Sequence, residues 1–99
     1  GTLSGCGPAY AYMFLNALCD GAVLRGVPRQ KARQYAAQTL LGSARMVLES
    51  GKHPEALKDE VCSPGGSTIA GVRALEAHGF RSAVMEALDA AVTRSKELG

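Results

Sequence analysis

Residues 7–26 of this chain read GPAYAYMFLNALCDGAVLRG, an apolar stretch with Pro8 near one end and Gly26 at the other. Proline fits the first position of a helix and glycine follows the end of one, so we expect a helix from Pro8 to about Leu24 or Arg25. Apolar side chains cover this helix almost all round, and such a helix has to be surrounded by protein. A chain of 99 residues cannot easily surround it alone. We therefore expect burial in a partner, a second copy of the same chain.

Further helical patterns follow, each bounded by proline or glycine. A second helix is expected from Pro28 to about Ser50, with apolar residues at spacings of three and four and with Gly51 after its end. A short helix is expected at residues 55–61 after Pro54, a fourth at residues 68–78 and a fifth at about residues 80–98. No segment alternates with period two, so no strand is expected. The sequence predicts an all-α fold of about five helices in a single domain spanning residues 1–99.

Cysteine and histidine usage gives no sign of a metal site. Cys6, Cys19 and Cys62 are widely spaced and form no C-x-x-C pair, so neither a disulfide framework nor a zinc site is supported. Reduced thiols fit the cytoplasm, with the mitochondrial matrix as the alternative. His53 and His78 lie far apart, and we expect each of them at the surface or at a helix end.

Large charged or lipid partners are disfavoured. The formal net charge is only +2. A basic patch of Arg25, Arg29, Lys31 and Arg33 near the start of the second helix would suit DNA, but both flanking helices are far longer than those of a compact helix-turn-helix. We expect a solvated face or an intersubunit ion-pair surface there, and no nucleic acid. Residues 9–24 are shorter than a bilayer span and contain polar residues, so no membrane span is expected.

Residues 61–71 read VCSPGGSTIAG and place a proline and two glycines directly before a helical pattern. We expect Ser67 to be the N-cap and Thr68 to open the helix. Glycine lets the backbone approach a ligand closely, and the first N–H groups of a helix attract negative charge. The pattern therefore suits a carboxylate or a phosphate, with two hydroxyls beside it. The alternative is a turn followed by a serine cap, with no ligand.

Other catalytic patterns are missing from the sequence. There is no nucleophile elbow, no P-loop and no G-x-G-x-x-G after a strand, so no dinucleotide site is expected in this chain. Asp59 and Glu60 are adjacent and would point about 100° apart on a helix. We expect them to be solvated or capping groups and not an acid–base pair.

Several motifs, in order and in register, extend over nearly the whole chain: LSGCGPAY at residues 3–10, GVPR at 26–29, AQT at 37–39, SGKHP at 50–54, SPGGST at 63–68, HGFR at 78–81 and RSKEL at 94–98. With them the chain resembles the C-terminal dimerisation domain of the pyrroline-5-carboxylate reductases. Three residues depart from the family pattern. Cys6 stands where Ser is frequent, Cys62 where Ser or Thr is frequent, and Glu60 where Asn or Gln is common, and their roles are left open.

The resemblance implies a complete enzyme larger than this chain. An N-terminal Rossmann domain outside these residues would bind NADPH or NADH, and the enzyme would reduce 1-pyrroline-5-carboxylate to L-proline, the last step of proline synthesis. The helical domains of two chains would interlock like the C-terminal domain of 6-phosphogluconate dehydrogenase. Such dimers can assemble further into rings. This chain alone would be inactive.

The resemblance also implies roles for individual residues. Backbone N–H groups of Gly65, Gly66 and Ser67, together with Ser63, would hold the substrate carboxylate. Val61 would contribute to the substrate pocket. The hydroxyl of Thr68 would lie near the ring nitrogen as the catalytic residue, since it can donate or accept a hydrogen bond. Two alternatives remain: a non-catalytic helical dimerisation module, and a related two-domain reductase of another small carboxylate.

Overall fold

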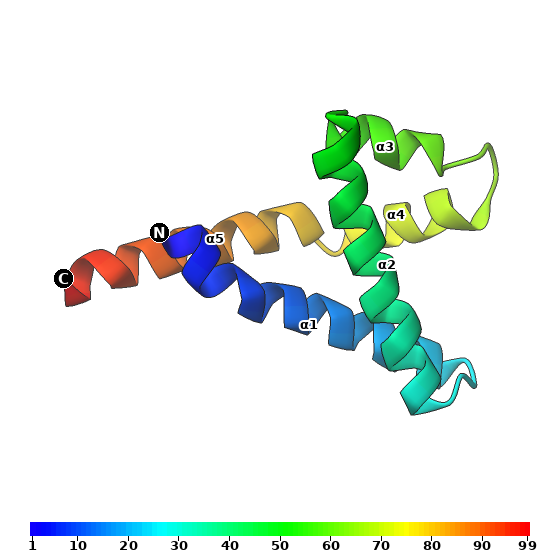
Figure 1. Ribbon diagram of the computed structural model, residues 1–99, viewed down its shortest axis with the longest axis horizontal. Helices are drawn as coiled ribbons and strands as arrows, with labels where there is room; N and C mark the ends of the chain where they lie inside the picture. The colour runs from blue at the N-terminus through cyan, green and yellow to red at the C-terminus, as the bar shows by residue number, and fades with distance from the viewer. The chain divides into compact units, whose positions relative to one another are not determined.

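The structure, a computed structural model, describes residues 1–99 as five α-helices without a strand (Figure 1). The helices are α1 (Thr2–Leu24), α2 (Arg29–Ser50), α3 (Pro54–Glu60), α4 (Ser67–Ala77) and α5 (Phe80–Leu98). The predicted all-α class and the number of helices are confirmed. None of the helices combines the length and the apolar content that crossing a membrane requires.

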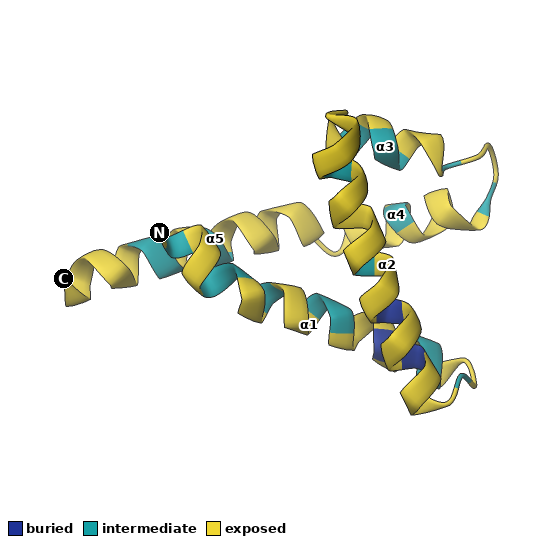
Figure 2. Cartoon of the chain, in the orientation of Figure 1, coloured by how far each residue is buried: buried dark blue, intermediate teal, exposed yellow.

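The chain divides into two compact units, Gly7–Gly51 and a second one made of Gly1–Cys6 with Lys52–Gly99. The expected single domain therefore stays a prediction. In the first unit, α1 and α2 meet near the connection between them, where Cys19, Ala32 and Ala36 are buried (Figure 2). These side chains are small, so the interior of the unit is small as well. Arg29 pairs with Asp20, and its Nη1 also donates to Cys19 Sγ at 3.5 Å.

The second unit contains α3, α4 and α5. Gly79, with φ of +70°, separates α4 from α5, and the two helices contact each other. No residue of α3, α4 or α5 is fully buried, although Leu57, Val72 and Leu88 are half-buried. The unit therefore has little apolar interior of its own.

The prediction that Pro8 opens the first helix is wrong, because α1 begins at Thr2 and contains Pro8. The residues before the proline already form a helical turn, in which the Gly5 N–H donates to the Gly1 carbonyl at 3.0 Å. Proline inside a helix removes one bond to the fourth residue before it, here the carbonyl of Ser4. The boundary between the two units follows Cys6, close to this missing bond. Pro28 likewise precedes α2 as its N-cap and is not its first residue.

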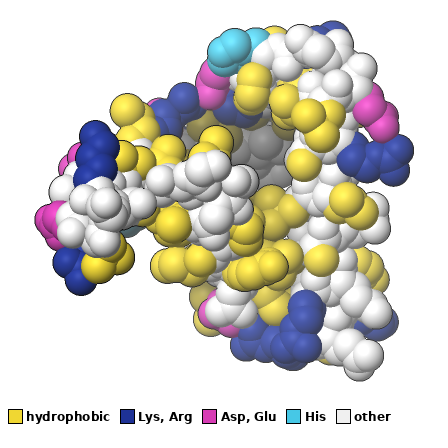
Figure 3. All heavy atoms as spheres, turned by 60° about the vertical axis from the view of Figure 1, so that its left-hand side comes forward, with side chains coloured by type: hydrophobic (Ala, Val, Ile, Leu, Met, Phe, Trp, Pro, Cys, Tyr) yellow, Lys and Arg dark blue, Asp and Glu magenta, His cyan; other side chains and the backbone are white.

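Most of the apolar surface of a single chain is open. Sixteen large hydrophobic side chains are exposed, and Figure 3 shows hydrophobic side chains open on the face that it draws. On α1 the exposed ones are Leu3, Tyr12, Met13, Leu18 and Leu24, which bears out the expectation that one chain cannot cover this helix. Monomeric proteins rarely leave so much apolar surface exposed, and large patches mark interaction sites.

This surface leads to a prediction about assembly. We expect the chain to sediment as a dimer or a larger oligomer. We also expect Met13→Asp to weaken self-association about a hundredfold or more, because Met13 is 71% exposed and the change would bury a carboxylate in each copy. Analytical ultracentrifugation over a range of concentrations measures both. A folded, monodisperse monomer of the unmodified chain would contradict the prediction.

Candidate functional site

Helix α3 leads the chain into the candidate site. His53 caps it, since the His53 Nδ1 accepts a hydrogen bond from the Glu55 N–H at 3.0 Å, and Pro54 occupies the first helical position. The helix tightens at its end, where the N–H of Val61 donates to the Lys58 carbonyl at 3.1 Å. Residues 61–66 then form the connection to α4, called here the α3–α4 loop.

The α3–α4 loop contains a tight turn. The Gly66 N–H donates to the Ser63 carbonyl at 3.1 Å, with Pro64 and Gly65 between them. Gly65 has φ of +70°, and a proline followed by a glycine with positive φ is the pattern of a type II turn. A Cβ on Gly66 would lie 2.6 Å from the Ser63 Oγ and 3.2 Å from the Ser63 carbonyl oxygen. The Ser63 side chain therefore occupies the space that a side chain on Gly66 would need.

The N-terminus of α4 differs by one residue from the prediction. Gly66 is the N-cap, with φ of −83° and ψ of 175°, so Ser67 is the first helical residue and Thr68 the second. The expectation that Ser67 caps the helix is wrong, because the Gly66 carbonyl already accepts the first helical bond, from the Ala70 N–H at 3.4 Å. No side chain caps α4. The N–H groups of its first turn are therefore open to a ligand.

The polar groups of this region have few partners within the chain. No hydrogen bond in the chain occupies the hydroxyls of Ser63, Ser67 or Thr68, and all three residues are exposed. The N–H of Gly66, by contrast, is used by the turn. This removes one donor from the set that the family resemblance implied. The free donors are concentrated at the start of α4.

The predicted site residues therefore share one short segment. Val61 is the C-cap of α3 and is exposed, and the remaining ones lie in the turn and in the first turn of α4: Ser63, Gly65, Gly66, Ser67 and Thr68. The exposed members of this segment are open to a ligand.

The structure accounts for Glu60, whose role the sequence left open. Its Oε1 lies 2.8 Å from the Nζ of Lys52, so the carboxylate next to the loop is paired with a cation. Asp59 is more exposed, and its Oδ1 lies 3.5 Å from the Lys58 Nζ. The two adjacent acids thus have different cationic partners, and both are exposed to solvent, as the sequence predicted.

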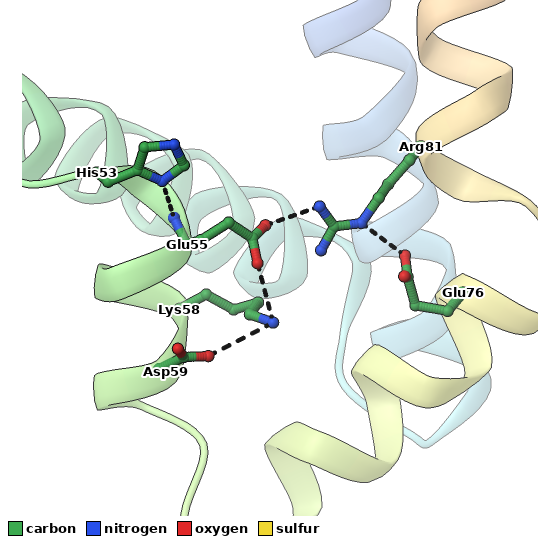
Figure 4. A network of polar contacts seen from close by, with 6 residues as sticks. All are labelled: His53, Glu55, Lys58, Asp59, Glu76 and Arg81. Carbon is green, nitrogen blue, oxygen red and sulfur yellow. Dashed lines mark hydrogen bonds and ion pairs between the residues drawn. The ribbon is translucent and has the colours of Figure 1, made fainter.

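A polar network that the sequence did not reveal joins three helices of the second unit (Figure 4). Arg81 Nη1 lies 2.9 Å from Glu55 Oε1, and Arg81 Nε donates to Glu76 Oε1 at 2.9 Å. Hydrogen bonds from Arg81 and then from Lys58 lower the pKa of Glu55, and the two carboxylates raise the pKa of Arg81. The spacing of Glu55 and Lys58 on one helix was visible in the sequence. The 26-residue separation of Glu55 and Arg81 gave no signal.

The histidines are found at helix ends, as predicted. His53 caps α3, and the Nδ1 of His78 lies 2.8 Å from the Ala74 carbonyl oxygen at the end of α4. The three cysteines are free. No three side chains of the His, Cys, Asp and Glu types gather into a group that could hold a metal ion.

Comparison with known proteins identifies the family. The sequence model described as "Pyrroline-5-carboxylate reductase dimerisation" matches residues 1–98. The chain belongs to this family. The pyrroline-5-carboxylate reductase of Escherichia coli K12 is 56% identical over 96 residues, which are 97% of this chain and 36% of that protein. The enzyme of Pisum sativum is 57% identical over 96 residues, 97% of this chain and 35% of that protein.

Solved structures agree with the fold of this dimerisation domain. Plasmodium falciparum pyrroline carboxylate reductase with NADP bound matches with a TM-score of 0.95 and 42% identity, over 99% of this chain and 40% of that chain. A pyrroline-5-carboxylate reductase from Coxiella burnetii gives a TM-score of 0.95 and 41% identity, over 99% and 36% of the two chains. The chain thus spans just over a third of the length of its curated relatives. Membership of a dimerisation family supports self-association, in agreement with the exposed apolar surface.

Proposed function

We propose that this chain is the C-terminal domain of a pyrroline-5-carboxylate reductase, which reduces 1-pyrroline-5-carboxylate to L-proline with NADPH or NADH in proline synthesis. The observation that carries the proposal is the family match over residues 1–98, which includes the whole α3–α4 loop and α4. The chain would supply the dimer core and the substrate loop of the enzyme.

In the proposed site the substrate carboxylate lies at the N-terminus of α4. The open N–H groups there, with the positive end of the helix, favour an anion. Ser63, Gly65 and Ser67 contribute donors from the loop and the first turn, whereas Gly66 allows the close approach and Val61 borders the pocket. Binding of the carboxylate fixes the ring relative to Thr68.

The hydroxyl of Thr68 is proposed to contact the ring nitrogen. It has no partner within the chain, so it is free to donate to, or accept from, the substrate. Because a hydroxyl is a weak acid, the ring nitrogen either arrives protonated or receives its proton through a water molecule. The role of Thr68 is then to orient the C=N bond, and alignment of reacting groups can supply much of a rate enhancement.

The nicotinamide cofactor is assigned to another part of the enzyme. The five helices include no strand and no strand–turn–helix unit with a glycine-rich fingerprint, so these residues do not fit a dinucleotide-binding fold. When bound, the cofactor supplies the hydride that reduces the C=N bond. The NADP-bound relative from Plasmodium falciparum supports a nicotinamide cofactor. The N-terminal domain of the full-length protein would provide most of its contacts.

The proposed partners follow from the open surfaces. A second copy of the chain would cover the exposed apolar residues, and dimers can assemble further into rings. The nucleotide domain and the dimer core would supply the remaining contacts to a substrate bound at the α3–α4 loop. The three free cysteines are compatible with the proposed cytoplasmic location, although they suit the mitochondrial matrix equally well.

The test is oxidation of NADPH and NADH by the full-length protein with 1-pyrroline-5-carboxylate. We expect turnover with the five-membered ring, and much weaker turnover with the six-membered ring imine and with an open-chain analogue. Preference for one of those analogues would instead indicate a related reductase of another small carboxylate. A folded dimer that turns over none of the three substrates would favour the non-catalytic dimerisation module.

A further inference from the structure

Helix α3 cannot hold its position by itself. It has seven residues, and none of them is buried. Isolated helices shorter than about 12 residues are marginal in water. The helix nevertheless leads directly into the α3–α4 loop, so its position determines where that loop begins. Contacts with other elements are needed to fix both.

Ion pairs engage both ends of α3. Near its start, Glu55 Oε1 lies 2.9 Å from Arg81 Nη1, and Glu55 Oε2 lies 3.2 Å from Lys58 Nζ. At its end, Glu60 Oε1 lies 2.8 Å from Lys52 Nζ. Both carboxylate oxygens of Glu55 therefore have a cationic partner, and one of these partners comes from a different helix.

Arg81 connects the two helices on either side of the loop. It is the second residue of α5, and its guanidinium contacts Glu55 on α3 and Glu76 in the last turn of α4 (Figure 4). The planar fork of arginine can contact two carboxylates at once in a fixed geometry. The chain between Glu55 and Glu76, which includes the α3–α4 loop at residues 61–66, is thereby held at both ends by the same side chain.

We propose that this Arg81 bridge is a positioning device that holds the α3–α4 loop and the first turn of α4 in the conformation that binds the substrate carboxylate. Arg81 and Glu55 are then positioning residues, which act through the loop and do not touch the substrate. The inference rests on the proposed function and adds residues to it.

A local role fits the exposure of the bridge. The side chains of Arg81, Glu55 and Glu76 are 51%, 45% and 48% exposed. Ion pairs in such surroundings contribute little to global stability and are screened by salt. Loss of the bridge should therefore affect the loop much more than the folded dimer.

The experiment compares Glu55→Gln with Glu49→Gln in the full-length enzyme. Glutamine keeps the size of the side chain and removes its charge. The control breaks an exposed pair of similar length, Glu49 Oε1 with Arg45 Nη2 at 2.9 Å on α2, away from the loop in the sequence. The measurements are kcat and KM for 1-pyrroline-5-carboxylate, and hydrogen–deuterium exchange of peptides covering residues 61–70 in the unliganded dimer.

We expect Glu55→Gln to raise KM about three- to tenfold while kcat changes less than about twofold, since the loop would hold the carboxylate equally in ground and transition states. Exchange in residues 61–70 should become faster, because the bonded amides of Cys62 and Gly66 open more often. The control should change neither quantity. Arg81→Lys keeps the charge but lacks the fork, so its KM should lie between wild type and Glu55→Gln.

Two results would overturn the proposal. One is an unchanged KM together with unchanged exchange in residues 61–70. The other is faster exchange within α3 alone, with the loop and KM unaffected, which would make the bridge merely structural. If the wild type does not turn over 1-pyrroline-5-carboxylate, the proposed function fails, and the exchange data still decide whether the bridge holds the loop. If Glu55→Gln does not fold, Arg81→Lys takes its place in both measurements.

Discussion

Thr68→Ala in the full-length protein is expected to lower kcat/KM for 1-pyrroline-5-carboxylate about a hundredfold, with the dimer intact. Removing one positioned hydrogen-bonding group from a reaction centre typically has an effect of this order. The fold should tolerate the change, because Thr68 is exposed, is the second residue of α4 and has a hydroxyl that makes no hydrogen bond within the chain. Steady-state oxidation of NADPH, with sedimentation as the check on assembly, measures both parts.

Two variants make this result specific. Thr68→Ser keeps the hydroxyl and should retain most of the activity. Thr93→Ala makes the same chemical change at an exposed position of α5 and should leave the kinetics unchanged. Wild-type kcat/KM in Thr68→Ala would remove Thr68 from the reaction and favour the view that the turn and α4 are structural only.

Gly66→Val is expected to weaken the binding of L-proline, the proposed product, about tenfold or more. The backbone of Gly66 is extended and open to any residue, so the effect is steric: its Cβ would lie 2.6 Å from the Ser63 Oγ and 3.2 Å from the Ser63 carbonyl oxygen. The hydroxyl can rotate away, but the carbonyl belongs to the turn that places the loop. Overpacking of this kind typically costs about 1–3 kcal/mol, and 1.4 kcal/mol corresponds to a tenfold change in affinity.

Calorimetric titration of the full-length dimer with L-proline measures this effect. Gly71→Val is the matched control, because Gly71 also lies on α4 and a Cβ there would meet nothing within 4 Å. It should bind L-proline like the wild type. Unchanged affinity in Gly66→Val would mean that the proposed anion site at the start of α4 is misplaced.

The sequence predicted the ends of the helices better than their beginnings. Gly51 and Gly79 both adopt positive φ after a helix, a conformation that few other residues take up. Glycines at these positions therefore indicate where the preceding helices end. The first residue of a helix is less strictly determined by the sequence, because several residue types are accepted at the N-cap. The sequence pattern places Pro8 at the start of a helix although it lies inside α1, and it makes Ser67 the cap although Gly66 occupies that position.

The loop could be found in the sequence because local rules encode it. Proline and two glycines in a row specify a turn between Ser63 and Gly66 without help from the rest of the fold. The bridge from Arg81 to Glu55 and Glu76 depends on three helices meeting, and no periodicity reports such a meeting. The use of the Gly66 N–H within the turn was equally invisible, because it depends on the backbone geometry of the loop.

The small interior of the chain has a thermodynamic consequence. Cys19, Ala32 and Ala36 are its only buried residues, so a single copy has little to gain from folding alone. Folding and assembly then become one equilibrium, in which the second copy acts as a ligand of the folded state. The melting temperature of this protein then rises with its concentration, and dilution alone is expected to favour the unfolded chain.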